Sequence, residues 1–222
     1  IALGLAATLA VVAVALVGSS YLEHRRLVAE ERAAFPAPGT RVEVGHGAAR
    51  NVPGLHLHVY AEGEGDPTLV FLAGHGTSAP YFDFLPLFER LSADTRIAVI
   101  ERVGYGWSDL GPSPRDIDTV LRQTRAAIRQ AGLSPPFVLV PHSLAGLEAV
   151  LWAQRHPAEI EAIVGLDPLV PGYVERSGEG ASLSPLITLL ARTGLMRSGP
   201  DVFETNFPAA VEGRLSAADM AA

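Results

Sequence analysis

Residues 140–146 read Val-Pro-His-Ser-Leu-Ala-Gly, with a serine at the centre of the stretch. An apolar run precedes it at 137–140, and a run with helical periodicity follows it at 144–156. The order strand, sharp turn, helix lifts a serine hydroxyl above the sheet and directs the first N–H groups of the helix toward the same place. We therefore predict that Ser143 is a nucleophile, the alternative being a buried serine that caps the helix.

This turn departs from its usual form, Gly-x-Ser-x-Gly, at both glycines. Ala145 replaces the second glycine and is still small enough for a strand and a helix that crowd each other. Pro141 replaces the first glycine and lacks its freedom at positive φ, which argues against the usual turn geometry. Gly146 offers additional space one residue later.

The chain around this turn alternates short apolar runs with helical stretches. Buried strands are predicted at 68–72, 96–100, 137–140 and 160–166, after a hairpin formed by 41–44 and 55–60. Ser113 as N-cap, with Pro114 at the first helical position, predicts a helix that ends before Gly132. Alternating helices and wholly apolar strands are typical of an α/β fold with a mainly parallel sheet.

Composition excludes several kinds of function. The 222 residues carry a net charge of −7, and no Lys/Arg cluster is interleaved with aromatic residues, so no nucleic-acid partner is expected. There are no cysteines, which excludes disulfides, cysteine-based zinc sites and thiol catalysis. His56 and His58 share one strand face, as two metal ligands would, but no third ligand is near in sequence. We interpret them as a solvated strand face and predict no metal site.

The N-terminal segment suits a membrane. Residues 1–17 carry no charge and are almost wholly apolar, and Arg25 and Arg26 follow. About 20 apolar residues span a bilayer, and the run reaches that length when it is counted to residue 22. We predict that 1–22 form a transmembrane anchor in a lipid bilayer, making the protein a single-pass membrane protein, with 23–39 as a stalk. A cleaved signal peptide and a buried helix are the alternatives.

The pattern changes after the last predicted strand. We predict a core at 40–168 and the start of a helical cap, or lid, at 169–222, with an apolar helix at 183–195. The sequence does not begin with methionine, and its last residues have the pattern of a starting helix. We therefore expect it to be part of a longer protein.

Four segments carry a resemblance to a known family. They are Phe71-Leu72-Ala73-Gly74-His75-Gly76, residues 101–109 (Glu-Arg-Val-Gly-Tyr-Gly-Trp-Ser-Asp), residues 141–146, and residues 162–168 (Ala-Ile-Val-Gly-Leu-Asp-Pro). In this order and at this spacing they resemble the α/β-hydrolase family, from about Arg41 to Pro168. The Pro-His-Ser start of the turn and the apolar N-terminus are similar to a branch of membrane-anchored bacterial hydrolases. The resemblance implies the α/β-hydrolase fold, a serine–acid–histidine triad and no cofactor.

The resemblance also assigns roles to single residues. The backbone N–H groups of His75 and Leu144 are expected to form the oxyanion hole. Asp167, which ends the sixth predicted strand, is a candidate for the acid. The side chain of His75 is not assigned as the base, because the family order is serine, then acid, then histidine. His142 is expected to point into the structure, and His156 is interpreted as a charge partner at a helix end.

The loop at 101–109 gathers charged residues around a tight, glycine-rich turn. Glu101 ends a predicted strand, where a catalytic group would be well placed, and Arg102 and Asp109 lie close to it in sequence. One hypothesis is acid–base catalysis by this loop. We favour the other, a structural network of ion pairs and turn hydrogen bonds.

The resulting functional prediction is a serine hydrolase that cleaves a small ester, or an amide, through an acyl-enzyme on Ser143. The serine argues against epoxide hydrolases and haloalkane dehalogenases of the same fold, which need a carboxylate at this position. We expect the acid and the histidine to lie beyond residue 222, and the 222 residues alone to be inactive. An aminopeptidase-type hydrolase of the same fold and a non-catalytic, membrane-tethered binding protein are the alternatives.

Overall fold

The structure is a computed structural model that describes residues 2–44, 54–111, 115–172 and 185–195. The chain forms two compact units, which we describe separately. One unit consists of residues 1–36 and 180–222, and the other of residues 37–179.

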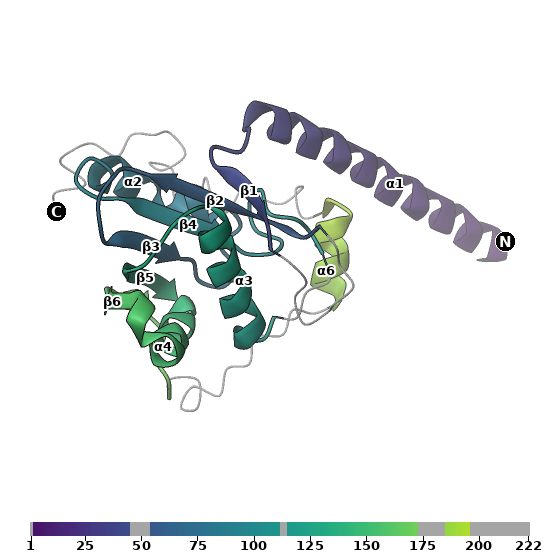
Figure 1. Ribbon diagram of the computed structural model, residues 1–222. Helices are drawn as coiled ribbons and strands as arrows, with labels where there is room; N and C mark the ends of the chain where they lie inside the picture. Colours follow the sequence, from purple (N-terminus) through teal and green to yellow (C-terminus); the bar gives the residue numbers. More distant parts are fainter. Residues whose placement is uncertain (1, 45–53, 112–114, 173–184, 196–222) are drawn as a thin grey trace, which may run out of the picture. The chain divides into compact units, whose positions relative to one another are not determined.

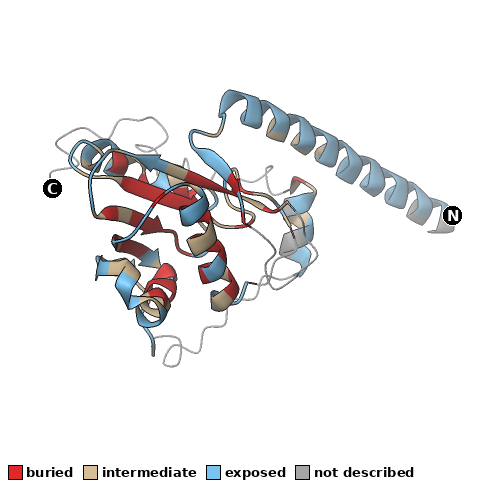
Figure 2. Cartoon of the chain, in the orientation of Figure 1, coloured by how far each residue is buried: buried red, intermediate tan, exposed pale blue. Residues whose placement is uncertain are grey.

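The first unit is built on one long helix, α1 (Ala2–Ala34), which continues without a break from the predicted anchor into the predicted stalk (Figure 1). The helix is long and apolar enough to cross a membrane, a test of length and composition that a signal sequence or the core helix of a soluble protein would also pass. None of its most apolar window is buried, and Figure 2 shows the helix mainly exposed, with half-buried residues in its second half. A second helix, α6 (Pro185–Arg192), lies within the predicted cap helix.

The second unit is organised by a sheet with the strand order β1-β2-β4-β3-β5-β6. Its strands are β1 (Thr40–Glu43), β2 (His56–Glu62), β3 (Thr68–Leu72), β4 (Ile97–Glu101), β5 (Phe137–Ser143) and β6 (Ile160–Ile163), and the short β7 (Leu166–Pro168) pairs with the end of β5. β1, β2 and β4 pair antiparallel, whereas β4, β3, β5 and β6 pair parallel. The predicted α/β class, the hairpin and the mainly parallel sheet are thereby confirmed.

Helices cover both faces of this sheet (Figure 1): α2 (Pro80–Leu91), α3 (Ile117–Gln130) and α4 (Ala145–Arg155). Side chains of β3 alternate between the faces, because successive residues of a strand point to opposite sides. Val70 and Leu72 pack in the cluster with α3 and α4, and Phe71 packs with the aromatic residues of α2. Figure 2 shows the central strands buried on both sides, which explains why their sequences are apolar without alternation.

Two predicted boundaries differ from the structure. The single strand predicted at 160–166 is divided into β6 and β7, with Asp167 at a positive φ of 46°. The predicted N-cap of α3, Ser113, lies outside the described residues, and the helix begins later, after Asp116. The Asp116 carboxylate accepts a hydrogen bond of 2.9 Å from the N–H of Thr119, so an acidic side chain satisfies one of the free donors of the first turn.

A partly buried carboxylate fixes the end of α4 against α3. The indole N–H of Trp152, whose side chain is fully buried, donates to Glu159 at 2.7 Å, and Arg125 of α3 forms an ion pair with the same carboxylate. Hydrogen bonding from Arg125 lowers the pKa of Glu159 below its usual 4.5, and the Trp152 hydrogen bond acts in the same direction.

We expect Glu159→Gln to lower the free energy of unfolding by about 1–2 kcal/mol at pH 7, because the neutral amide loses the ion pair with Arg125. It also keeps only one oxygen to accept the three hydrogen bonds that Arg125 and Trp152 donate to the carboxylate. The pKa of the folded state is depressed, so the carboxylate stabilises the fold above its unfolded pKa. This contribution is lost as the pH falls through the lower pKa of the folded state. Denaturant melts of the wild type and Glu159→Gln should therefore converge between pH 5 and pH 3. Glu161→Gln, at an exposed position of β6, is the control and should have little effect at either pH.

Candidate active site

The predicted nucleophile lies at a strained turn between β5 and α4. Ser143 is the last residue of β5 and has a positive φ of 50°, and α4 begins two residues later. A positive φ is costly for a residue with a side chain and persists where the surrounding structure enforces it, often at active sites. The carbonyl oxygen of Ser143 also accepts a 2.7 Å hydrogen bond from the N–H of Leu169, which fixes the turn from the side of β7.

Pro141 does not prevent this turn. It is a buried residue of β5 and lies opposite Leu72 of β3. Ser143 adopts the left-handed conformation, and residue 141 does not. The ability of glycine to adopt a positive φ is therefore not required at position 141. The argument from the sequence against the usual turn geometry was therefore wrong.

Gly146 is the position near the turn that requires a residue without a side chain. A Cβ at this position would overlap the carbonyl oxygen of Leu169 and lie 2.9 Å from the Cβ of Pro168. The segment after β7 thus passes directly over the first turn of α4. Ala145 is fully buried, and its methyl group is accommodated in the core.

We expect Gly146→Ala to lower the free energy of unfolding by about 1–3 kcal/mol, because an added methyl group meets backbone atoms that cannot move independently. Thermal melting measures the effect. Gly18→Ala is the matched control, since no atom lies within 4 Å of the added Cβ on α1 and its melting temperature should not fall. Equal melting of Gly146→Ala and the wild type would show that the Leu169 segment is not packed as described.

The loop after β3 approaches the serine closely. A Cβ built on Gly74 would lie 2.9 Å from the Cβ of Ser143, so only glycine permits this approach. The next residue is His75, and neither its backbone N–H nor that of Leu144 donates to an acceptor within the part of the chain that the structure describes. Both N–H groups are thus available to a ligand, as an oxyanion hole requires, and their assignment to that role stays a prediction.

His142 is exposed, so the prediction that it points into the structure is wrong. It alternates with Val140 along β5 and therefore lies on the sheet face covered by α2. Asp83, in the first turn of α2, lies close enough to interact with it. Desolvation raises the pKa of Asp83, and His142 together with a hydrogen bond from Thr77 opposes this shift. His142 and Asp83 thus lie on the same face of the sheet, and His142 directly precedes the serine in the chain.

A base for Ser143 is not found within residues 2–44, 54–111, 115–172 and 185–195, where no side chain hydrogen bonds to its hydroxyl. His156 follows α4 at its far end, about 16 Å along the helix from the turn, which agrees with the interpretation of a helix-end residue. Asp167 is exposed in β7, where its neighbours pair with His142 and Ser143. Its candidacy as the acid stays a prediction.

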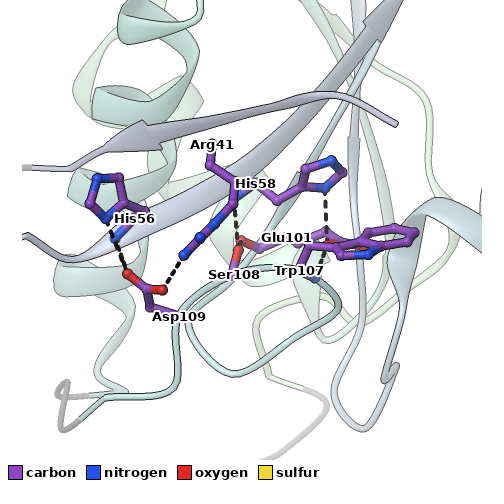
Figure 3. Close-up of polar contacts among 7 residues, drawn as sticks. All are labelled: Arg41, His56, His58, Glu101, Trp107, Ser108 and Asp109. Atoms are coloured by element: carbon purple, nitrogen blue, oxygen red, sulfur yellow. Dashed lines mark hydrogen bonds and ion pairs between the residues drawn. The ribbon is translucent and has the colours of Figure 1, made fainter. Parts of the chain in front are cut away.

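A buried polar network holds the loop that follows β4 (Figure 3). Glu101, at the end of β4, accepts hydrogen bonds from Nδ1 of His58 at 3.0 Å and from the N–H of Trp107 at 2.7 Å, and both partners of the His58–Glu101 pair are fully buried. Nε2 of His58 accepts from the N–H of Gly39 at 3.2 Å, so the Nδ1–H tautomer satisfies every partner. The prediction of a solvated face at 56 and 58 is wrong for His58, because a carboxylate from another strand satisfies its imidazole.

The other charged residues of the 101–109 loop are also paired. Asp109 binds Arg41 and Nδ1 of His56 in a more exposed cluster (Figure 3). Arg102 forms an ion pair with the buried Glu148 of α4. These contacts confirm the structural network and leave no carboxylate of this loop directed at Ser143. Within the described residues no group of three or more potential ligands could hold a metal ion.

Comparison with known proteins identifies the family. The family model described as alpha/beta hydrolase fold matches residues 67–190, more than half of the chain. The chain belongs to the α/β hydrolase fold family. The match includes the serine turn, the Gly74 loop and the loop at 101–109, whereas His58 and Gly39 precede it.

Two relatives show how much of the family's length is covered. The uncharacterized protein YbdG of Bacillus subtilis is 45% identical over 127 residues, which are 57% of this chain and 39% of that protein. A haloalkane dehalogenase of Agrobacterium fabrum is 28% identical over 144 residues, 64% of this chain and 44% of that protein. The chain thus spans less than half the length of each of these two relatives.

Solved structures with similar coordinates agree on the fold. A thermophilic esterase from Thermogutta terrifontis superposes with a TM-score of 0.56 at 17% identity, over 78% of this chain and 64% of the esterase. Other similar proteins are named as an epoxide hydrolase and an acyltransferase. The proteins that this chain resembles are thus named for several chemistries, and the residues of the site must decide among them.

Proposed function

We propose that the protein is a serine hydrolase that cleaves a small ester, or an amide, through an acyl-enzyme on Ser143. The observation that carries the proposal is the turn itself. A serine held at positive φ stands beside two backbone N–H groups that have no acceptor among the described residues. A strained nucleophile next to unused donors is the arrangement that acyl transfer needs.

The chemistry follows in two steps. Oγ of Ser143 attacks the carbonyl carbon as a histidine base takes its proton, and the negative charge that develops on the carbonyl oxygen is stabilised by the N–H groups of His75 and Leu144. The leaving alcohol or amine takes the proton from the histidine, and water then cleaves the acyl-serine ester. We expect the base and its acid partner in the part of the full-length protein that follows residue 222.

The serine supports this chemistry over that of some relatives. Haloalkane dehalogenases and epoxide hydrolases of this fold need a carboxylate nucleophile at the turn, and this chain has a hydroxyl there. A hydroxyl favours substrates with an acyl carbon, such as esters and amides.

The proposal includes attachment to a membrane through residues 1–22. The support is the uninterrupted apolar half of α1, whose side chains Leu9, Val11 and Val14 are 60%, 68% and 73% exposed. Apolar side chains exposed in this way are unfavourable in water. In the hydrocarbon core of a bilayer their exposure carries no hydrophobic penalty.

A fluorophosphonate probe tests the serine chemistry, because it reacts only with an activated serine. The full-length protein should gain one adduct, which peptide mapping should locate at Ser143, whereas the 222-residue chain alone should gain none. Ser134→Ala, at an exposed serine that precedes β5 at the end of the strand opposite the turn, should label like the wild type. An unlabelled full-length protein would refute the proposal and favour a non-catalytic, membrane-tethered binding protein.

A further inference from the structure

A basic groove of about 600 Å³ runs along the second half of α1. One wall is the face of α1 that carries Tyr21, Arg25 and Arg32. The two arginines are seven residues apart, so they lie on the same side of the helix, about 10 Å from each other along its axis. The opposite wall includes Arg192, in the last turn of α6.

Specific contacts hold Arg192 over this face of α1. The hydroxyl of Ser20 donates a 3.0 Å hydrogen bond to the carbonyl oxygen of Thr193, the residue that follows Arg192. Gly194 lies so close to α1 that a Cβ there would be 2.5 Å from the Cβ of His24, and its φ of 77° also favours glycine. The groove is therefore built by packing between the two helices.

The three arginines of the groove have no ion-pair partner within the described ranges 2–44, 54–111, 115–172 and 185–195. Their neighbour Arg26 differs, because it pairs with Glu23 and Glu30 at 2.6 Å each. Three uncompensated guanidinium groups around one groove are complementary to an anion. Arginine binds phosphate oxygens through paired N–H donors, so phosphate is the chemistry that this set fits best.

The position of the groove indicates where the phosphate comes from. The exposed apolar half of α1 precedes it, and Tyr21 stands at the junction, as aromatic residues do at membrane interfaces. Arg25 lies about 5 Å beyond residue 22 along the helix, within the headgroup layer of a bilayer that contains residues 1–22. Arg32 lies about 15 Å beyond, but helical side chains tilt toward the N-terminus and long ones reach back toward the membrane.

We propose that this groove binds the phosphate of an anionic phospholipid, with Arg25, Arg32 and Arg192 as its ligands. The proposal rests on the membrane attachment proposed above. Each arginine or lysine near an anionic lipid surface increases the affinity of the protein for that lipid roughly five-fold. Two arginines should therefore account for more than a ten-fold preference.

Native mass spectrometry of the full-length protein in detergent, titrated with phosphatidylglycerol, phosphatidylcholine or inorganic phosphate, tests this site. Phosphatidylglycerol should bind at least ten-fold more tightly than phosphatidylcholine. Arg25→Gln should weaken its binding about five-fold, and Arg25→Gln/Arg32→Gln more than ten-fold. Arg26→Gln removes the same charge one residue away but outside the groove, and should change the affinity less than two-fold.

Equal losses in Arg25→Gln and Arg26→Gln would overturn the proposal in favour of unspecific charge attraction. Competition by inorganic phosphate at the concentration at which phosphatidylglycerol binds would overturn it in favour of a free anion. Alkaline extraction of membranes from expressing cells separates failure of the groove from failure of the anchor. A protein that stays in the membrane but does not distinguish the lipids refutes the groove alone, and a released protein refutes both.

Discussion

Ser143→Ala is expected to lower kcat for ester hydrolysis by the full-length protein about 10⁴-fold or more, and to abolish fluorophosphonate labelling. The hydroxyl oxygen forms the covalent bond in the proposed reaction, and no other described nucleophile lies at this turn. The oxyanion donors and the substrate pocket would remain, so a small residual rate above the uncatalysed reaction is expected. Steady-state hydrolysis of a short-chain p-nitrophenyl ester measures the loss.

A second substitution at the same position separates catalysis from strain. Ser143→Gly should be as inactive as Ser143→Ala, but it should unfold at a higher temperature, because glycine adopts a φ of 50° without the penalty of about 1 kcal/mol that alanine meets. Retained turnover in both variants would contradict the assignment of the nucleophile. Equal melting temperatures would contradict the strained turn and leave the chemistry intact.

The sequence predicted the sheet well because its central strands are buried on both faces. A run such as Val70 to Leu72 has no solvated side, so it reads as a wholly apolar segment between polar turns. The boundary between β6 and β7 was missed because it depends on packing. The ring of Pro168 packs against Gly165 so closely that it would overlap a Cβ at position 165. Asp167, between them, adopts a left-handed conformation. Neither feature has a periodic signal in the sequence.

The sequence predicted those parts of the candidate site that depend on residues close together in the chain. Strand, turn and helix around Ser143 are local, and so is the small residue required near it. The burial of His58 is not local, because its partner Glu101 is 43 residues away in the chain. An imidazole alternating with apolar residues has the pattern of a solvated face, and only the pairing of β2 with β4 reveals the carboxylate beside it.

We expect Glu101→Leu to lower the free energy of unfolding by about 3–5 kcal/mol and Glu101→Gln by about 1–2 kcal/mol. Leucine removes the acceptor of the buried His58 Nδ1–H and of the half-buried Trp107 N–H, whereas glutamine retains one oxygen. Denaturant melts measure both losses. Arg41→Ala is the control, since it breaks an ion pair of the neighbouring, partly exposed cluster and should cost less than about 1 kcal/mol. Equal losses for Arg41→Ala and Glu101→Leu would show that the buried carboxylate is not the support of this network.

The same carboxylate should also affect the reaction, although it does not face the serine. Trp107 is held by Glu101, and the loop that contains it binds the loop after β3 through two hydrogen bonds, from Gly106 N–H to the carbonyl oxygen of Ser78 and from Gly76 N–H to the Tyr105 hydroxyl. The loop after β3 carries the N–H of His75. Loosening of this support should displace an oxyanion donor that acts only as negative charge develops. Glu101→Gln should therefore lower kcat of the full-length protein about ten-fold with little change in KM. A rise in KM at constant kcat would instead place the loop in substrate binding.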